Sequence, residues 1–232
     1  MERAVLNDIR KQDYFYVENI KTLRTNLQFC GKDMKTIVIT SCYPNEGKSN
    51  IALSLAQELG RIGKKVLLLD ADIRKSTYQS RYLVDMEVNG LSQYLSGQIG
   101  GHGIIYATNF PNMHMIFAGP TAPNPSELLS DDNFKLLLEE TREYYDYVLV
   151  DTPPMTSVID AAIVARECDG AILVIESDAV SFKVAQKAKN QLEKSGCRIM
   201  GAVLNKVDVK KDKYYSKYYG KYGKYYKSSE DK

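Results

Sequence analysis

Short runs of consecutive apolar residues alternate along this chain with segments in which apolar residues recur at helical spacing. Continuous apolar runs that end at polar or turn residues are typical of strands buried on both faces of a parallel sheet. Such runs lie at residues 36–40, 65–70, 147–150, 170–175 and 198–204. The alternation predicts an α/β fold, with a mostly parallel central sheet and helices on both of its faces.

Helices are expected between these runs. Apolar residues at helical spacing predict an amphipathic helix over residues 16–29, ahead of the first strand. One continuous helix is expected over residues 126–143, with Ser126 as its N-cap. Residues 1–12 are polar and are expected to be loose, and residues 75–125 are less regular than the rest. A further strand is expected at residues 113–117, and further helices at residues 50–56, 90–97, 160–167 and 181–194.

A loop at residues 41–49 joins the first apolar run to the helical segment after it. A strand, a tight turn and a helix in this order are the setting of the phosphate-binding P-loop, whose backbone N–H groups surround an anion at the helix N-terminus. Gly47 allows the turn, Lys48 can reach the β- and γ-phosphates of a nucleotide, and the Ser49 hydroxyl can bind Mg²⁺. Cys42 stands where the G-x-x-x-x-G-K-[ST] pattern has its first glycine. The loop predicts a nucleotide site despite this departure.

Two other apolar runs end in aspartates. Asp70 and Asp72 close the second run, and Asp151 closes the third. Parallel strands bring such ends to one edge of the sheet, where open α/β sheets bind their ligands. Asp151 has the pattern of a Walker B aspartate, which holds Mg²⁺ directly or through water. The alternative is that Asp151 caps the next helix, since Pro153 and Pro154 turn the chain here.

The composition is that of a soluble globular domain. The chain has 232 residues, of which 44% are hydrophobic and 26% charged, and a formal net charge of +2; this length suits one sizeable α/β domain. The four cysteines lie far apart without a C-x-x-C pair, so they predict neither a zinc site nor a disulfide framework. The start has no signal-peptide pattern, and no apolar run approaches the ~20 residues of a membrane span. We therefore expect a soluble, intracellular protein.

The composition changes abruptly after Asp208, where tyrosines alternate with lysines, glycines and serines. Such a segment buries too little apolar surface to offset its ordering entropy, so we expect a flexible tail. The mixture could bind single-stranded nucleic acid or an anionic membrane surface, or its tyrosines could be phosphorylated. The tail alone does not decide among these hypotheses. Its tyrosines are Tyr214, Tyr215, Tyr218, Tyr219, Tyr222, Tyr225 and Tyr226.

Three motifs and the tail together resemble one family, the bacterial tyrosine kinases of capsule and exopolysaccharide synthesis, in their separate-chain cytoplasmic form. The loop at residues 41–49 looks like the family's Walker A motif, residues 67–74 are similar to its Walker A′ motif, and residues 148–154 to its Walker B motif. The resemblance covers nearly the whole chain. It implies a P-loop NTPase-like fold and an ATP-dependent protein-tyrosine kinase. Such a kinase phosphorylates its own tyrosine cluster in trans and regulates polysaccharide synthesis and export.

The resemblance also implies a division of the chain and a set of site residues. Residues 1–35 would form a helical segment for oligomerisation, residues 36–208 the kinase domain, and residues 209–232 the autophosphorylated tail. The residues expected to act in catalysis are Lys48, Asp70, Asp72 and Asp151. Those expected to hold Mg²⁺ are Ser49, Asp72 and Asp151. Those expected to bind ATP are Pro44, Asn45, Glu46, Gly47, Lys48, Ser49, Asn50 and Asn205.

Within this set Asp70 is the candidate for orienting or deprotonating the incoming tyrosine hydroxyl. Asn205 and Lys206 are expected near the base of the nucleotide. The implied partners are a membrane-embedded polysaccharide co-polymerase that activates the kinase, a cognate phosphotyrosine phosphatase, and further copies of the chain in a homo-oligomeric ring. The implied localisation is cytoplasmic, with recruitment by the activator to the inner face of the plasma membrane. No nucleic acid is expected as a partner.

Two positions depart from the patterns of known relatives. The kinase family carries an E-x-x-R-x-x-R motif that packs subunits into a ring; here Glu18 and Arg24 match it, but the middle position is Lys21. Lysine cannot reproduce a bidentate guanidinium contact, so the ring interface is expected to be weaker or differently paired, and a solvated charged face is the alternative. MinD/ParA-type ATPases carry a signature lysine where this chain has Tyr43. They are the competing hypothesis, together with an ATP-gated assembly module that has no kinase activity.

Overall fold

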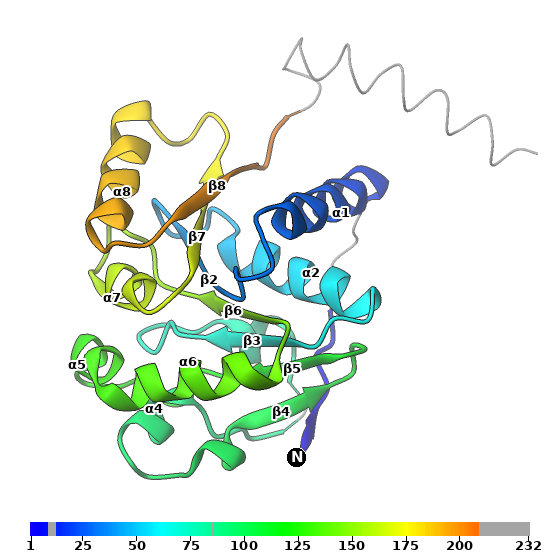
Figure 1. Ribbon diagram of the computed structural model, residues 1–232, viewed down its shortest axis with the longest axis vertical. Coiled ribbons are helices and arrows are strands. Elements are labelled where there is room, and N and C mark those ends of the chain that lie inside the picture. The colour runs from blue at the N-terminus through cyan, green and yellow to red at the C-terminus, as the bar shows by residue number, and fades with distance from the viewer. Residues whose placement is uncertain (9–12, 85, 209–232) are drawn as a thin grey trace, which may run out of the picture.

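A single mixed sheet runs through the middle of the molecule (Figure 1). The computed structural model describes residues 1–8, 13–84 and 86–208, and within them the sheet has eight strands. The strands are β1 (Arg3–Ala4), β2 (Thr36–Ser41), β3 (Val66–Asp70), β4 (Ile105–Thr108), β5 (Met113–Ile116), β6 (Tyr147–Asp151), β7 (Gly170–Glu176) and β8 (Ile199–Asn205).

The strand order explains how distant motifs meet. Neighbouring strands follow the order β1-β4-β5-β3-β6-β2-β7-β8, and every described pair is parallel except β4–β5. Strands β3, β6 and β2 are therefore adjacent, and their carboxyl ends lie at the same edge. Asp70 of β3 is directly opposite Asp151 of β6, and Ile39 of β2 is opposite Asp151 on its other side. The predicted fold class is confirmed.

Helices cover both faces of the sheet. Helices α1 and α2 lie on one face, and α6, α7 and α8 on the other (Figure 1). Among the described residues, no helix is long and apolar enough to pass through a bilayer. The helices are α1 (Tyr14–Phe29), α2 (Lys48–Arg61), α3 (Tyr78–Arg81), α4 (Leu91–Leu95), α5 (Pro125–Ser130), α6 (Asp132–Tyr144), α7 (Asp160–Arg166) and α8 (Phe182–Lys194), with a 3-10 turn at Gly101–Gly103.

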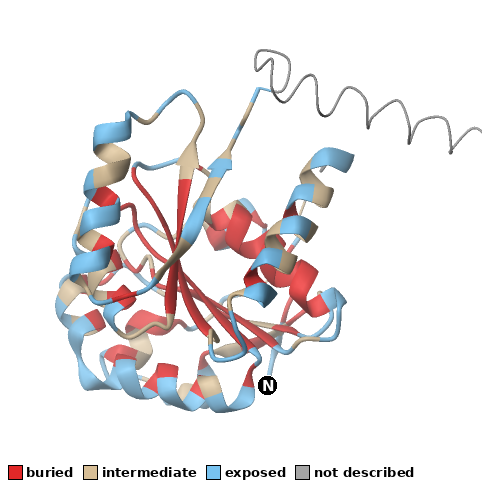
Figure 2. Cartoon of the chain, turned by 45° about the horizontal axis from the view of Figure 1, so that its top comes forward, coloured by how far each residue is buried: buried red, intermediate tan, exposed pale blue. Residues whose placement is uncertain are grey.

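Alternate residues of each central strand enter two separate cores. In β2, Ile37 and Ile39 pack with residues of α1 and α2, whereas Val38 packs with residues of α6, α7 and α8. All three side chains are 0% exposed. Figure 2 shows the result, because the central strands are buried along their length while the outer sides of the helices are exposed. Apolar residues on both sides of a strand are what the continuous runs in the sequence indicated.

The amino-terminal residues are ordered into the sheet, so the expectation that residues 1–12 are loose is wrong for their first part. Arg3 and Ala4 form β1, which pairs with β4, a strand that the sequence pattern did not predict. Leu6 is 1% exposed, and its N–H donates to Asn109 Oδ1 at 2.9 Å. The signal is a run of three apolar residues, Ala4 to Leu6, in a polar stretch, and this run is too short for a period to be recognised.

The helix expected over residues 126–143 is two helices. Asp131 has extended backbone geometry, ends α5 and caps α6, because its side chain accepts a hydrogen bond from the Asn133 N–H at 2.9 Å. Ser126 is not an N-cap, since Asn124 precedes α5. The Ser126 hydroxyl instead donates a hydrogen bond to Asp160 Oδ1 at 2.7 Å. An aspartate that begins a new helical turn is a capping signal, and here it outweighs the continuous helical spacing.

The buried start of the chain makes a testable contribution to stability. We expect Leu6→Ala to lower the free energy of unfolding by about 2–4 kcal/mol, because it removes a fully buried side chain and leaves a cavity. Leu136→Ala is the matched control: Leu136 is 47% exposed on α6, and its loss is expected to cost less than about 1 kcal/mol. Urea unfolding of both variants measures the difference. Equal effects would mean that the first residues add nothing to the core.

Candidate functional site

The loop between β2 and α2 has the backbone of a tight anion-binding turn. Asn45 and Gly47 have φ angles of 67° and 95°, both in the left-handed region, and α2 begins at Lys48. A Cβ on Gly47 would lie 2.2 Å from Asn205 Nδ2, so this position requires glycine for space as well as for conformation. The amino end of α2 thereby presents its free N–H groups to one side of the loop, which is where a phosphate binds.

The buried side chains of Glu46 and Cys42 lie between the loop and the core of the protein. The Glu46 side chain is 2% exposed, and one of its carboxylate oxygens accepts a hydrogen bond from the Cys42 N–H at 2.7 Å. The Cys42 side chain is 0% exposed and belongs to the core on the α6–α8 face. Burial raises the pKa of the Cys42 thiol to about 11, so the thiol stays protonated and unreactive. Cys42 thus replaces the first glycine of the motif as a small core residue.

Two carboxylates lie within 4 Å of the end of Lys48, and a third stands beside them. Lys48 Nζ lies 3.4 Å from Asp151 Oδ1 and 3.9 Å from Asp72 Oδ2. It also donates a hydrogen bond to Ser49 Oγ at 3.2 Å. Asp70 stands beside Asp151 at the end of the neighbouring strand. The structure therefore brings all four predicted catalytic residues together, with the Ser49 hydroxyl beside them.

Burial changes the charge of this cluster. Burial raises the pKa of Asp70 to about 8, and the nearby negative charge of Asp151 adds to the effect. The pKa of Asp151 is also raised by burial, although the Lys48 ammonium opposes that shift. Asp70 accepts hydrogen bonds from the Ser76 hydroxyl and from the Asp72 N–H. A carboxyl group that keeps its proton near neutral pH is a stronger base than an exposed one once that proton has left.

The arrangement fits a magnesium nucleotide. Asp151 is 1% exposed and pairs with Lys48 through Oδ1, but neither of its carboxylate oxygens accepts a hydrogen bond of regular geometry within the described part of the chain. Buried polar atoms of this kind call for a partner from outside. The described residues contain no cluster of three or more His, Cys, Asp or Glu side chains able to hold a metal by themselves. Mg²⁺ does not need one, since it takes one or two carboxylates and completes its octahedron with phosphate oxygens and water.

A cavity of about 500 Å³ opens above the loop and the carboxylates. Glu46 and Asn205 do not line it; they lie behind the loop. The predicted residues that line it are Pro44, Asn45, Gly47, Lys48, Ser49, Asn50, Asp70, Asp72 and Asp151. Lys206, which is expected near the base, also lines the cavity. The other lining residues are Arg74, Lys75, Ser76, Thr77, Tyr78, Arg81, Pro153, Pro154, Ser157 and Val158.

Two of these additional residues brace the site. Arg74 Nε donates to Asp160 Oδ2 at 2.6 Å, and Asp160 is 0% exposed at the start of α7. Tyr78 is 1% exposed, and its hydroxyl donates to the Ser49 carbonyl oxygen at 3.1 Å. Arg74 could have been found from its place beside the two aspartates. Tyr78 carries no such signal, because it lies in the irregular segment after the strand.

The residues predicted for oligomerisation make ion pairs within the chain. Glu18 and Lys21 pair at 2.6 Å on the exposed side of α1. Arg24 instead points to α2, where its Nη1 lies 3.4 Å from Glu58 Oε2. Glu58 also pairs with Arg61. The predicted phosphoacceptor tyrosines lie outside the described residues.

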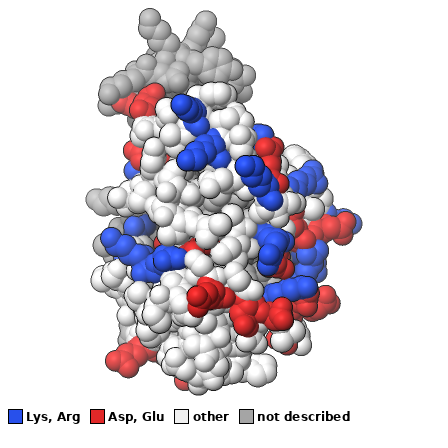
Figure 3. All heavy atoms as spheres, turned by 90° about the vertical axis from the view of Figure 1, so that its left-hand side faces the viewer, with Lys and Arg blue, Asp and Glu red and all other residues white. Residues whose placement is uncertain are grey.

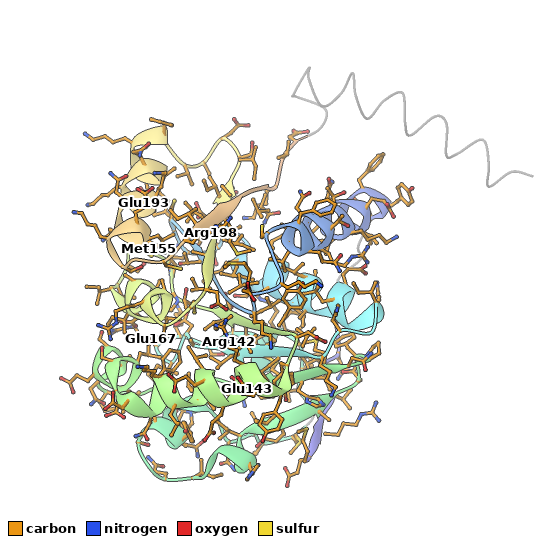
Figure 4. The ribbon with its side chains drawn as sticks, in the orientation of Figure 1. Arg142, Glu143, Met155, Glu167, Glu193 and Arg198 are labelled. Carbon is orange, nitrogen blue, oxygen red and sulfur yellow. The ribbon has the colours of Figure 1, made fainter. Side chains whose placement is uncertain are left out.

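Charges elsewhere serve the fold. On the face at the left of Figure 1, basic and acidic side chains are interspersed rather than gathered by sign (Figure 3). A second hollow of about 160 Å³ lies where β2 begins, with Thr36, Arg142 and Glu167 in its lining; the last two are labelled in Figure 4. Arg142 pairs with Asp169, whose other carboxylate oxygen accepts the Lys35 and Thr36 N–H groups. These contacts fix the start of β2.

Asp70 has a measurable effect on stability. Its folded pKa of about 8 exceeds the usual value for an unfolded chain. Between about pH 4 and pH 8 the folded state therefore keeps a proton that the unfolded state releases, and stability falls as pH rises through this window. We expect Asp70→Asn to remove that slope. In metal-free buffer its melting temperature should exceed that of the wild type by roughly 10 °C at pH 8.

The difference should shrink toward pH 4, where the folded and unfolded wild-type chains both hold the proton. Asp33→Asn, at an exposed position, is the control and should show no such trend. Melting curves across this pH range provide the measurement. A constant difference between Asp70→Asn and the wild type at every pH would contradict the assignment of the raised pKa.

Comparison with known proteins identifies relatives along most of the chain. The ParA family model, described as the NUBPL iron-transfer P-loop NTPase, matches residues 33–225. A tyrosine-protein kinase CpsD from Streptococcus agalactiae is 41% identical over 191 residues, which are 82% of this chain and 82% of that protein.

Solved structures agree with these matches. The kinase domain of the Escherichia coli tyrosine kinase ETK has a TM-score of 0.79 and 36% identity, over 83% of this chain and 76% of that chain. The septum site-determining protein MinD from Pyrococcus horikoshii, solved with Mg-ADP, has a TM-score of 0.66 and 25% identity, over 75% of this chain and 71% of that one. Both kinds of protein share the fold, and the tyrosine kinase is the more similar in sequence and in structure.

Proposed function

The chain belongs to the bacterial tyrosine kinases, a family with the ParA-type P-loop fold, and we propose that it transfers the γ-phosphoryl group of ATP to tyrosines of its own C-terminal tail. The observation that carries this proposal is the position of Lys48 between two buried or half-buried carboxylates at the amino end of α2. Phosphoryl transfer depends mainly on positioning and on charge neutralisation. A cation, metal-binding carboxylates and helix N–H groups in one cavity supply both.

Each residue then has a role. Backbone N–H groups of residues 45–50 would bind the phosphates, and Lys48 would neutralise their charge. When bound, ATP would supply the transferable group and Mg²⁺ a second positive charge beside it. Ser49, Asp72 and Asp151 are the residues that would hold the metal. Asp70 is the base that would accept the proton of the tyrosine hydroxyl, since it lies at the cavity and burial raises the pKa of its carboxyl group to about 8.

The tail is the proposed substrate. Residues 209–232 carry eight lysines and three acidic residues beside the seven tyrosines. Each phosphate adds up to two negative charges, so successive transfers reverse the sign of the tail. A tail with net negative charge would be repelled by the metal-binding carboxylates and would leave the site. Phosphorylation would thereby loosen a homo-oligomeric ring whose subunits exchange tails.

The biological setting is proposed by analogy with the relatives. The chain would regulate capsular or exopolysaccharide synthesis and export. A membrane-embedded co-polymerase would activate it and recruit it to the inner face of the plasma membrane, and a cognate phosphotyrosine phosphatase would reset it. Within the ring, Glu18, Lys21 and Arg24 would contribute to contacts between subunits, although Arg24 would first have to leave Glu58.

The mass of the intact protein after incubation with ATP distinguishes the kinase hypothesis from the hypothesis of a MinD-like ATPase. After incubation with ATP, Mg²⁺ and the cytosolic segment of the activator, we expect the mass to rise in steps of one phosphate. Truncation after Asp208 should abolish the gain, because the acceptor tyrosines are then absent. Lys48→Met is the matched negative control for the active site. Release of free phosphate without a gain in mass would support the ATPase and contradict the kinase.

Transfer between subunits can be tested by mixing two incomplete chains. The Lys48→Met chain has a tail but no active site, whereas the chain truncated after Asp208 has an active site but no acceptor. If transfer occurs in trans, the mixture should place phosphotyrosine on the Lys48→Met chain, and that chain alone should gain none. Mass spectrometry of the separated chains gives the result. An unmodified Lys48→Met chain in the mixture would exclude transfer in trans.

A further inference from the structure

The last two strands contact the P-loop at consecutive residues. Asn205 Nδ2, at the end of β8, donates to the Glu46 carbonyl oxygen at 2.8 Å. Lys206 Nζ, on the next residue, donates to the Asn45 carbonyl oxygen at 2.7 Å. Lys206 Nζ also lies 2.8 Å from Glu176 Oε2, at the end of β7. Two successive carbonyl groups of the loop are thus held by two successive side chains.

The backbone shows that these contacts are specific to the conformation of the loop. Asn45 and Lys206 are both non-glycine residues with positive φ, at 67° and 56°. Side chains other than glycine rarely adopt this region unless the surroundings hold them there. Asn205 lies so close to Gly47 that a single methyl group at Gly47 would collide with it. The loop and the segment 205–206 therefore fit each other in one arrangement.

We propose that Lys206 and Asn205 are positioning residues of the nucleotide site, and that Glu176 acts through Lys206. They fix the carbonyl groups of Asn45 and Glu46 on the far side of the loop, so that the loop N–H groups face the phosphates. The three residues are called the latch below. This role deepens the proposed function and rests on it, because it concerns the same nucleotide site.

A direct contact between Lys206 and the nucleotide is the rival role, since Lys206 lines the cavity. The two roles predict opposite effects at Glu176, which does not line the cavity. If Lys206 bound the nucleotide itself, Glu176 would compete for its ammonium group, and neutralising Glu176 would strengthen binding. If Lys206 acts on the loop, Glu176 holds it in place, and neutralising Glu176 weakens binding.

The test measures binding of ADP with Mg²⁺ to the full chain by calorimetry, so it needs no kinase activity. Lys206→Met keeps the length of the side chain and removes its charge, and Glu176→Gln keeps its shape. We expect Lys206→Met to weaken ADP binding on the order of tenfold and Glu176→Gln by about threefold. The double variant should bind no more weakly than Lys206→Met, because both changes break one connection.

The control is a similar ion pair away from the loop. Lys189 and Glu193, the latter labelled in Figure 4, pair at 2.5 Å on α8, and both are about half exposed. Lys189→Met and Glu193→Gln should leave ADP binding unchanged. Melting temperatures of all variants should stay near that of the wild type, since Lys206 is itself 45% exposed.

Each outcome decides between the roles. Weaker binding by Glu176→Gln, together with a non-additive double variant, supports the latch. Binding by Glu176→Gln that equals or exceeds that of the wild type overturns it. A wild-type chain that binds no ADP would overturn the nucleotide site and the latch with it. A wild type that binds ADP but transfers no phosphate would overturn only the kinase proposal.

Discussion

The confinement of several charges at one edge of the sheet is the constraint on which the site depends. Asp70 and Asp151 end adjacent buried strands, and each is 0–1% exposed. Two carboxylates so close in a dry environment cannot both be ionised without a nearby cation, which is why burial and mutual repulsion raise the pKa of Asp70. Lys48 is the cation that the loop brings to them. The same charge balance prepares the site for Mg²⁺, which adds positive charge where it is lacking.

The strand order is what makes this confinement possible. Because β6 lies between β3 and β2, the P-loop at the end of β2 and the acidic segment after β3 flank Asp151 from opposite sides. Apolar residues on both faces hold these strands rigid, so a side chain at their ends has little freedom to move away. The site is precise because its supporting strands belong to two packed cores, one on each face.

The sequence was sufficient for the architecture and for most of the site, because both depend on local patterns. Continuous apolar runs predicted the central strands, and the motifs at their ends located Lys48, Asp70, Asp72 and Asp151. The sequence patterns did not predict strands that form only because a strand distant in the sequence pairs with them. The strand β1 exists because β4 is beside it, and neither has a pattern of its own. The cap formed by Asp131 was missed because helical spacing continues across it.

The sequence also did not show which distant side chains bond to the loop. Asn205 and Lys206 are expected near the base, and the structure adds that their side chains donate hydrogen bonds to carbonyl groups of the loop. Spacing along the chain cannot distinguish a residue facing the nucleotide from one facing the loop, since both follow the same strand. Glu46 is similar: it belongs to the Walker A segment, yet its carboxylate is buried under the loop and bonded to Cys42.

The kinase and the switch ATPases share this fold, so the difference between them must lie in residues at the cavity and in what reaches it. Tyr43 occupies the place of the signature lysine in the ATPases. Its side chain is 40% exposed and is not part of the cavity lining, and its carbonyl oxygen accepts a hydrogen bond from the Ser41 hydroxyl. The loop thus contributes Lys48 as its cation within the cavity. Tyrosine cannot supply the charge of that lysine, so this position favours the kinase over the competing ATPase.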